Sequence, residues 1–204
     1  MQVLVLGPDW IYPIAQFVSD AFRFHNINSK FLFYQYSASE KTEYYIRKLK
    51  QMNLYNPLKK IITNRVENQI FKINHNIIIN EISNNRPDII FIIKGDYIHS
   101  ETIRKIKEIN RKTEIIAWYM DDPFIMWLTA NNQILFKECL KAASYFDKIF
   151  VFDKYFVDGI KYRLNKETYY LPLAFDENVF KKINVNKEYR LSFIGNLTDE
   201  RYEY

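Results

Sequence analysis

The sequence predicts an α/β domain whose largely parallel sheet is flanked by helices. Short apolar runs rich in β-branched and aromatic residues alternate with segments of helical length along the 204 residues. One of these runs, residues 89–93, is continuously apolar, which is typical of a strand buried on both faces. With 48% hydrophobic residues and only 4 Gly and 6 Pro, the composition excludes disordered and fibrous classes.

Strands and helices are expected to alternate along the whole chain. A long helical stretch between the second and third strands is expected to break at Pro57, because proline disfavours helix at the preceding residue. Ser100 is the expected N-cap of the next helix. The expected strands are residues 3–6, 30–36, 89–93, 114–120, 148–152, 168–171 and 189–194, and the main helices are residues 14–25, 42–84, 100–110 and 131–143.

Composition also bears on the compartment. A single cysteine, Cys139, cannot form an internal disulfide or a Cys-based zinc site. No run approaches the 18 apolar residues of a membrane span, and the first residues lack the features of a signal peptide. We therefore expect a cytoplasmic protein.

The positive charge is concentrated in one segment. The chain has 29 basic and 24 acidic residues, a net charge of +5, and residues 41–72 contain eight basic residues against Glu43 and Glu67. Such a segment could contact nucleic acid, an anionic surface or a phosphorylated substrate, or it could be a solvated helix face.

Several expected strands end in polar or glycine-containing tips. In open α/β sheets the carboxyl ends of the strands face the ligand crevice, so these tips should share one edge. The aromatic residues in the adjoining loops could stack on a sugar or a base. The predicted substrate-binding residues are Gly7, Trp10, Lys94, Gly95, Asp96, Asp121 and Phe124.

The motifs in the sequence bear on which kinds of nucleotide or metal site the protein has. The dinucleotide fingerprint fails after Gly7, and no phosphate-binding Walker loop is present. The three histidines are far apart, so no metal site is expected. The adjacent Asp121 and Asp122 could be a metal-binding pair, as in polymerase palms or single-domain glycosyltransferases, or a turn before Pro123.

Five motifs in order carry a family resemblance. They are Gly7-Pro8-Asp9-Trp10, Arg86-Pro87-Asp88 with Lys94-Gly95, Ala117-Trp118-Tyr119-Met120-Asp121-Asp122-Pro123, Tyr170-Leu171-Pro172-Leu173-Ala174-Phe175-Asp176 and Ser192-Phe193-Ile194-Gly195-Asn196. The set resembles the CgeB-type, or spore-maturation-protein-like, glycosyltransferases over nearly the whole chain.

This resemblance implies the two-domain GT-B fold, with a Rossmann-like acceptor half and a second half that binds a nucleotide-sugar co-substrate, without a bound metal or other cofactor. Residues 1–186 would be the acceptor half, and residues 187–204 the first strand and glycine loop of a truncated donor domain. Gly195, Asn196 and Arg201 would approach the donor diphosphate.

Glycosyl transfer requires a base for the acceptor hydroxyl, for which Asp122 is the first candidate and Asp9 the second. We expect the chain alone to be inactive, because most of the donor domain is missing. The alternative is a non-catalytic, stand-alone binding module of the same fold. A third hypothesis, a nucleic-acid or membrane-surface protein, would use the basic residues 41–72.

Overall fold

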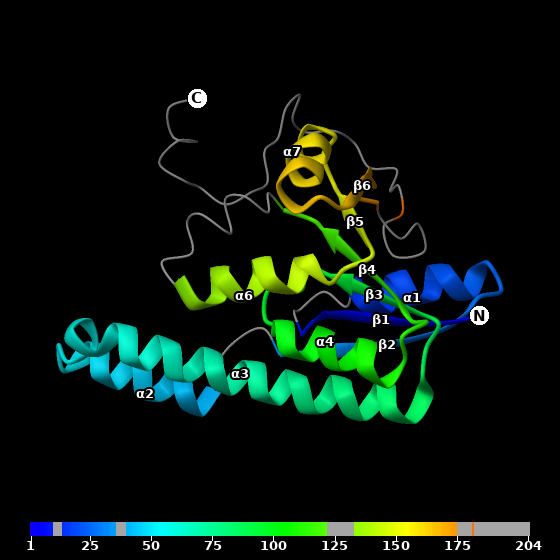
Figure 1. Ribbon diagram of the computed structural model, residues 1–204. Coiled ribbons are helices and arrows are strands. Elements are labelled where there is room, and N and C mark those ends of the chain that lie inside the picture. Colours follow the sequence, from blue (N-terminus) through cyan, green and yellow to red (C-terminus); the bar gives the residue numbers. More distant parts are fainter. Residues whose placement is uncertain (10–13, 36–39, 122–132, 175–180, 182–204) are drawn as a thin grey trace, which may run out of the picture. The chain divides into compact units, whose positions relative to one another are not determined.

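The computed structural model describes residues 1–9, 14–35, 40–121, 133–174 and 181. It contains a six-stranded sheet in the order β2-β1-β3-β4-β5-β6, and all neighbouring strands are parallel (Figure 1). This confirms the α/β class with a parallel, Rossmann-like sheet. The strands are β1 (Gln2–Pro8), β2 (Asn28–Tyr34), β3 (Ile89–Ile93), β4 (Glu114–Tyr119), β5 (Lys148–Val151) and β6 (Glu167–Tyr170).

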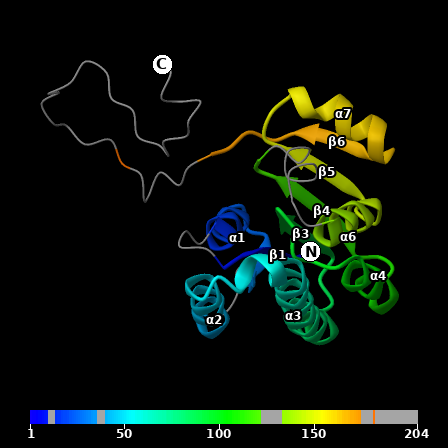
Figure 2. The same ribbon diagram turned by 90° about the vertical axis from the view of Figure 1, so that its left-hand side faces the viewer.

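The described helices cover the two faces of the sheet unequally. On one face α3, α4, α6 and α7 bury the larger core against the sheet, and on the other face α1 packs on Val3, Val5 and Phe91 (Figure 2). Because both faces of the central strands are covered, β3 is apolar along its whole length. The helices are α1 (Ile14–Phe24), α2 (Glu40–Gln51), α3 (Tyr55–Asn85), α4 (Ser100–Ile109), α6 (Gln133–Ser144) and α7 (Tyr155–Leu164).

Two helix boundaries differ from the sequence-based prediction. The long helical stretch breaks at residues 52–54, before Pro57, which is the third residue of α3. In the first helical turn the missing proline N–H has no intrahelical partner to lose, so proline is tolerated there. The N-cap of α4 is His99 rather than Ser100: its backbone is extended, and its ring accepts a hydrogen bond from the backbone N–H of Glu101.

The third strand spans Ile89–Ile93 as expected, whereas boundaries of the other described strands shift by one or two residues. The second strand spans Asn28–Tyr34 instead of residues 30–36, and β4 ends at Tyr119 rather than at residue 120. Pairing with β1 sets the extent of β2, since Gln2 aligns with Asn28 and Pro8 with Tyr34. The register therefore depends on a partner strand that local residue preferences do not reveal.

The chain divides into two compact units, Met1–Leu173 and Ala174–Tyr204. The sheet and its helices all belong to the first unit. The predicted domain boundary at residue 186 and the predicted start of a donor domain at residues 187–204 lie outside the described residues, so they remain predictions. Within the described part of the chain, no helix combines the length and hydropathy that crossing a bilayer requires.

Candidate ligand site at the carboxyl edge of the sheet

The order of the strands defines where a ligand would bind. From β1 the chain moves to β2 on one side and then to β3 on the other, so the topological switch point lies between β1 and β3. We call the residues that follow β1, β3, β4 and β5 at this edge the rim. The strands are parallel, so the prediction that these tips share one edge is confirmed. The rim consists of Asp9, Lys94, Gly95, Asp96, Asp121 and Asp153.

A sharp backbone turn follows β3 at the centre of the rim. Lys94 and Gly95 both have positive φ angles, 66° and 79°. The N–H of Lys94 donates to the carbonyl of Trp118 at 2.9 Å, and this bond continues the hydrogen-bond ladder with β4. The N–H of Gly95 donates back to the carbonyl of Ile93 at 2.9 Å. A lysine in the left-handed region is disfavoured, so the surrounding structure must hold it there.

Tyr34, at the end of β2, holds this turn. Its hydroxyl donates to the carbonyl of Ile93 at 2.8 Å and accepts from the N–H of Gly95 at 3.0 Å, and the side chain is completely buried. Sequence analysis did not single out Tyr34. A tyrosine within a predicted strand is the one sequence feature that points to this role, because a buried tyrosine hydroxyl needs a hydrogen-bond partner.

An ion pair joins the ends of β3 and β4. Lys94 Nζ lies 2.5 Å from Asp121 Oδ2, and the lysine side chain is only 7% exposed while the aspartate is 56% exposed. A buried ammonium group requires a paired charge, and Asp121 supplies it. Lys94 thus fixes the orientation of Asp121 at the surface of the rim.

The end of β1 supplies a second exposed carboxylate and a close contact with α1. Asp9 is exposed, and its N–H donates to the carbonyl of Tyr34 at 3.0 Å. Gly7 is buried, and a Cβ added to it would lie 2.6 Å from Cβ of Ala15 on α1. Glycine is required here for helix packing, and the predicted ligand contact of Gly7 remains a prediction.

Asp96 is a buried residue of the rim, with 2% of its surface exposed. Its carbonyl accepts a hydrogen bond from Sγ of Cys139 at 3.2 Å. Burial, with Asp96 adding to it, raises the pKa of the Cys139 thiol well above its usual value. Burial and the charges of Glu67 and Asp96 raise the pKa of Tyr97 to about 12. The Cys139 thiol and the Tyr97 hydroxyl are therefore protonated near neutral pH. The contact of Asp96 with substrate remains a prediction.

Next to the rim, the start of α4 is joined to α6 by Glu138. Ser100 Oγ donates to Glu138 Oε2 at 2.6 Å, and His99 Nε2 lies 3.1 Å from the same oxygen. Burial raises the pKa of Glu138, but hydrogen bonds from Ser100 and Lys141 outweigh it and lower the pKa below its usual value. Serine donates to the carboxylate and not to histidine, so this cluster is not arranged as a nucleophilic triad. It stabilises the contact between the two helices.

Six predicted site residues lie outside the described residues, and their roles remain predictions: Asp122, Trp10, Phe124, Gly195, Asn196 and Arg201. The described residues contain no group of three or more His, Cys, Asp or Glu side chains that could hold a metal ion.

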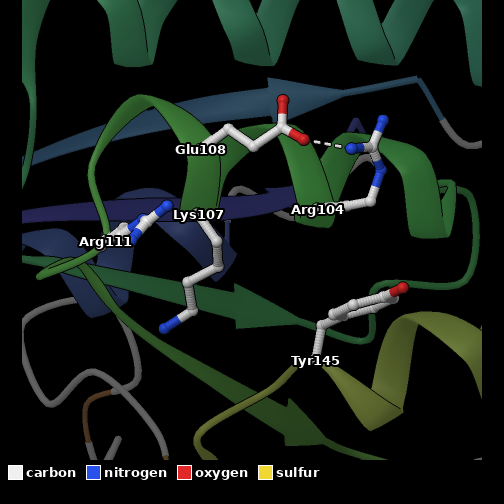
Figure 3. Close-up of a pocket in the computed structure, with 5 residues that line it drawn as sticks. All are labelled: Arg104, Lys107, Glu108, Arg111 and Tyr145. Atoms are coloured by element: carbon white, nitrogen blue, oxygen red, sulfur yellow. Dashed lines mark hydrogen bonds and ion pairs between the residues drawn. The ribbon is translucent and has the colours of Figure 1, made fainter.

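A hollow of about 340 Å³ lies elsewhere, between α4 and the end of α6 (Figure 3). Its cations largely have acidic partners: Arg104 pairs with Glu108 on the same helix, and Lys107 pairs with Asp147 at 2.5 Å. Figure 3 shows Lys107 and Glu108 pointing to opposite sides of α4. This hollow shares no residue with the rim, so it is not part of the candidate site.

No model of a protein family matches the sequence, and no curated protein matches it. Among solved structures, the chain is similar to Arabidopsis thaliana UGT89C1 complexed with UDP-L-rhamnose, with a TM-score of 0.48 and 15% sequence identity over 86% of this chain and 53% of that chain. A second crystal structure of Arabidopsis thaliana UGT89C1 matches with a TM-score of 0.44 and 16% identity, over 85% of this chain and 44% of that chain. The chain thus spans about half the length of these structures. Its class follows from its own sheet: a Rossmann-like α/β domain with polar side chains at the switch point.

Proposed function

We propose that this chain is the acceptor-side part of a GT-B glycosyltransferase and that the rim binds the acceptor. The observation that carries the proposal is the grouping of Asp9, Lys94 and Asp121 at the carboxyl edge of β1, β3 and β4. This is where open α/β sheets bind their ligands. The ordered motifs that resemble CgeB-type glycosyltransferases supply the reaction class.

The proposed chemistry is transfer of a sugar from a nucleotide-sugar to an acceptor hydroxyl. A carboxylate takes the hydroxyl proton while the acceptor oxygen bonds to the anomeric carbon, and the bond from that carbon to the diphosphate breaks. Asp122 is the first candidate for this base and Asp9 the second. Lys94 is a positioning residue: it holds Asp121, and so fixes the chain next to Asp122.

The donor would be bound by the second half of the fold, to which residues 187–204 contribute the first strand and loop. In this proposal Gly195, Asn196 and Arg201 contact the diphosphate of the donor, the acceptor is a glycan, protein or small molecule, and the reaction takes place in the cytoplasm. The chain alone would bind acceptor without transferring sugar.

The test uses the full-length gene product with a panel of nucleotide-sugars and a glycan array, and it measures release of the nucleoside diphosphate. We expect acceptor-dependent release with at least one donor. Replacing a catalytic base should lower kcat by about 100-fold or more with little change in KM, so D122N should do this and the distant surface variant D20N should not. If D9N alone has this effect, Asp9 is the base.

Two other outcomes would change the proposal. If no nucleotide-sugar is consumed but a glycan binds and the D9N variant weakens that binding, the protein is the non-catalytic binding module. If neither turnover nor glycan binding is detected, the acceptor-side assignment is wrong.

A further inference from the structure

The helices α2 and α3 form a hairpin that extends past the rim. Asn74 of α3 marks the level of the rim, because its side-chain amide bonds the backbone of Gln35, just after β2, and the carbonyl of Tyr97, after β3. All residues from Tyr55 to position 73 precede this point in α3. Figure 1 shows the α2–α3 turn on the side of the sheet toward which the strands run.

The outer part of this hairpin does not pack on the core. The first buried residue of α3 is Glu67, and none of the side chains described from 42 to 66 is fully buried. Residues 55–66 are thus about 18 Å of helix, at 1.5 Å per residue, along which no side chain is fully buried, and α2 is one of the helices that contact α3. We call residues 44–66 the hairpin tip.

The hairpin tip exposes a stripe of aliphatic side chains. Leu54, Leu58 and Ile61 follow one another at spacings of four and three residues, so they lie on one helix face. They are 45%, 40% and 67% exposed, and Met52 in the turn is 64% exposed. Tyr44 and Tyr45 on α2 are each about half exposed.

The charge around this stripe has one sign. The hairpin tip contains six basic residues and no acidic one. Lys48 and Lys50 lie over the rings of Tyr44 and Tyr55, at 4.9 and 5.1 Å from the ring centroids, so their stems cover aromatic surface while their ammonium groups remain at the surface. The basic residues are Arg47, Lys48, Lys50, Lys59, Lys60 and Arg65.

We propose that the hairpin tip docks on an anionic lipid bilayer, with the aliphatic stripe entering the interface and the lysines contacting acidic headgroups. The pattern of exposed aliphatic and aromatic side chains beside cations and no anions is that of interfacial helices. A nucleic acid would use the cations but not the aliphatic stripe. The proposal does not rest on the glycosyltransferase assignment, although it would place the rim on the side of the protein that faces the membrane.

Sedimentation with vesicles tests the charge component. We expect the full chain to bind vesicles of equal parts phosphatidylglycerol and phosphatidylcholine, not vesicles of phosphatidylcholine alone, and to be released at roughly 1 M salt, where the Debye length is about 3 Å. The K59Q/K60Q variant should bind at least tenfold more weakly, given about fivefold per lysine. The matched control K112Q/K161Q, which removes two exposed lysines elsewhere, should bind as the wild type does.

The aliphatic component separates a bilayer from other polyanions. The L58Q/I61Q variant should bind at least tenfold more weakly, and I77Q, which changes a 39% exposed isoleucine outside the hairpin tip, should not. A dye sensitive to polarity attached at I61C should shift to the blue on vesicles, whereas the same dye at I77C should not. The only native thiol, Cys139, is buried and will react slowly.

Three results would overturn the proposal. The first is no binding of the wild type to anionic vesicles. The second is equal binding of L58Q/I61Q and wild type, which would mean that no apolar contact forms. The third is duplex DNA or RNA binding at least as tightly as vesicles and insensitive to L58Q/I61Q, which would make the hairpin tip a nucleic-acid site. Thermal unfolding of each variant controls for folding, and all the replaced side chains are exposed.

Discussion

In the second half of α3, residues 67–85, Ile70, Ile78 and Ile82 are at most 3% exposed, whereas in the first half Leu58 and Ile61 are 40% and 67% exposed. Both halves belong to one continuous helix and carry similar aliphatic residues. They differ in their surroundings: Ile78 and Ile82 of the second half belong to the core cluster on the sheet, and no residue from 55 to 66 belongs to a core cluster. Tertiary position, not residue type, therefore decides whether an aliphatic side chain in this helix stabilises the fold or is available to a partner.

The largest expected effect follows directly from this contrast. Ile78→Ala, at a completely buried position, should lower the free energy of unfolding by about 3 kcal/mol, because it removes buried methylenes and leaves a cavity. Ile61→Ala should change it by no more than about 0.5 kcal/mol. Urea denaturation followed by circular dichroism measures both. Equal losses in the two variants would show that the hairpin tip is packed in solution.

A close contact between β1 and α1 gives the next effect. Gly7→Ala places a Cβ against Ala15, and we expect a loss of about 2 kcal/mol from overpacking. Replacing Ala15 by Gly removes the opposing Cβ at a cost of about 1 kcal/mol in helix propensity. The double variant should lose less stability than the sum of the losses in the two single variants. If the losses are strictly additive, the two positions do not clash.

A pair of tyrosines compares the rim with the hairpin tip. Tyr34→Phe removes the hydroxyl that bonds Ile93 and Gly95, and should cost about 1 to 2 kcal/mol because those backbone groups are buried. Tyr45→Phe, at a 53% exposed position, should have no measurable effect. Hydrogen exchange should also quicken at the Gly95 amide in the first variant. Unchanged exchange there would exclude Tyr34 as the residue that holds the turn.

The smallest effect concerns acid stability near the rim. The folded pKa of Glu138 is lowered, since hydrogen bonds from Ser100 and Lys141 outweigh burial, so its contribution to stability is complete above its ordinary value of 4.5 and is lost as the pH falls through the folded pKa. The stability difference between wild type and Glu138→Gln should therefore shrink as the pH is lowered from 7 toward 3. Urea titrations at several pH values measure it, and a difference that grows on acidification would contradict the lowered pKa.

Much of the fold follows from local patterns. The continuous run Ile89–Ile93 predicts a doubly buried strand, and the alternation of strands and helices predicts a parallel sheet whose tips share one edge. Serine is the commoner capping residue, so local preference predicts Ser100 as the cap of α4. In the structure His99 takes that place, and its ring also meets Glu138 on α6. Such a choice depends on a contact between residues 39 positions apart, which no local pattern contains.

The sequence by itself determined the class of the domain, the list of polar residues at the strand tips and the basic character of residues 41–72. The tertiary structure decided which of those residues act together: Lys94 pairs with Asp121, Tyr34 holds the turn at Gly95, and the aliphatic residues of the hairpin tip remain exposed. The physical reason is the range of the interactions. Periodicity and propensity are local, whereas ion pairs, buried hydroxyl bonds and burial depend on segments that only folding brings together.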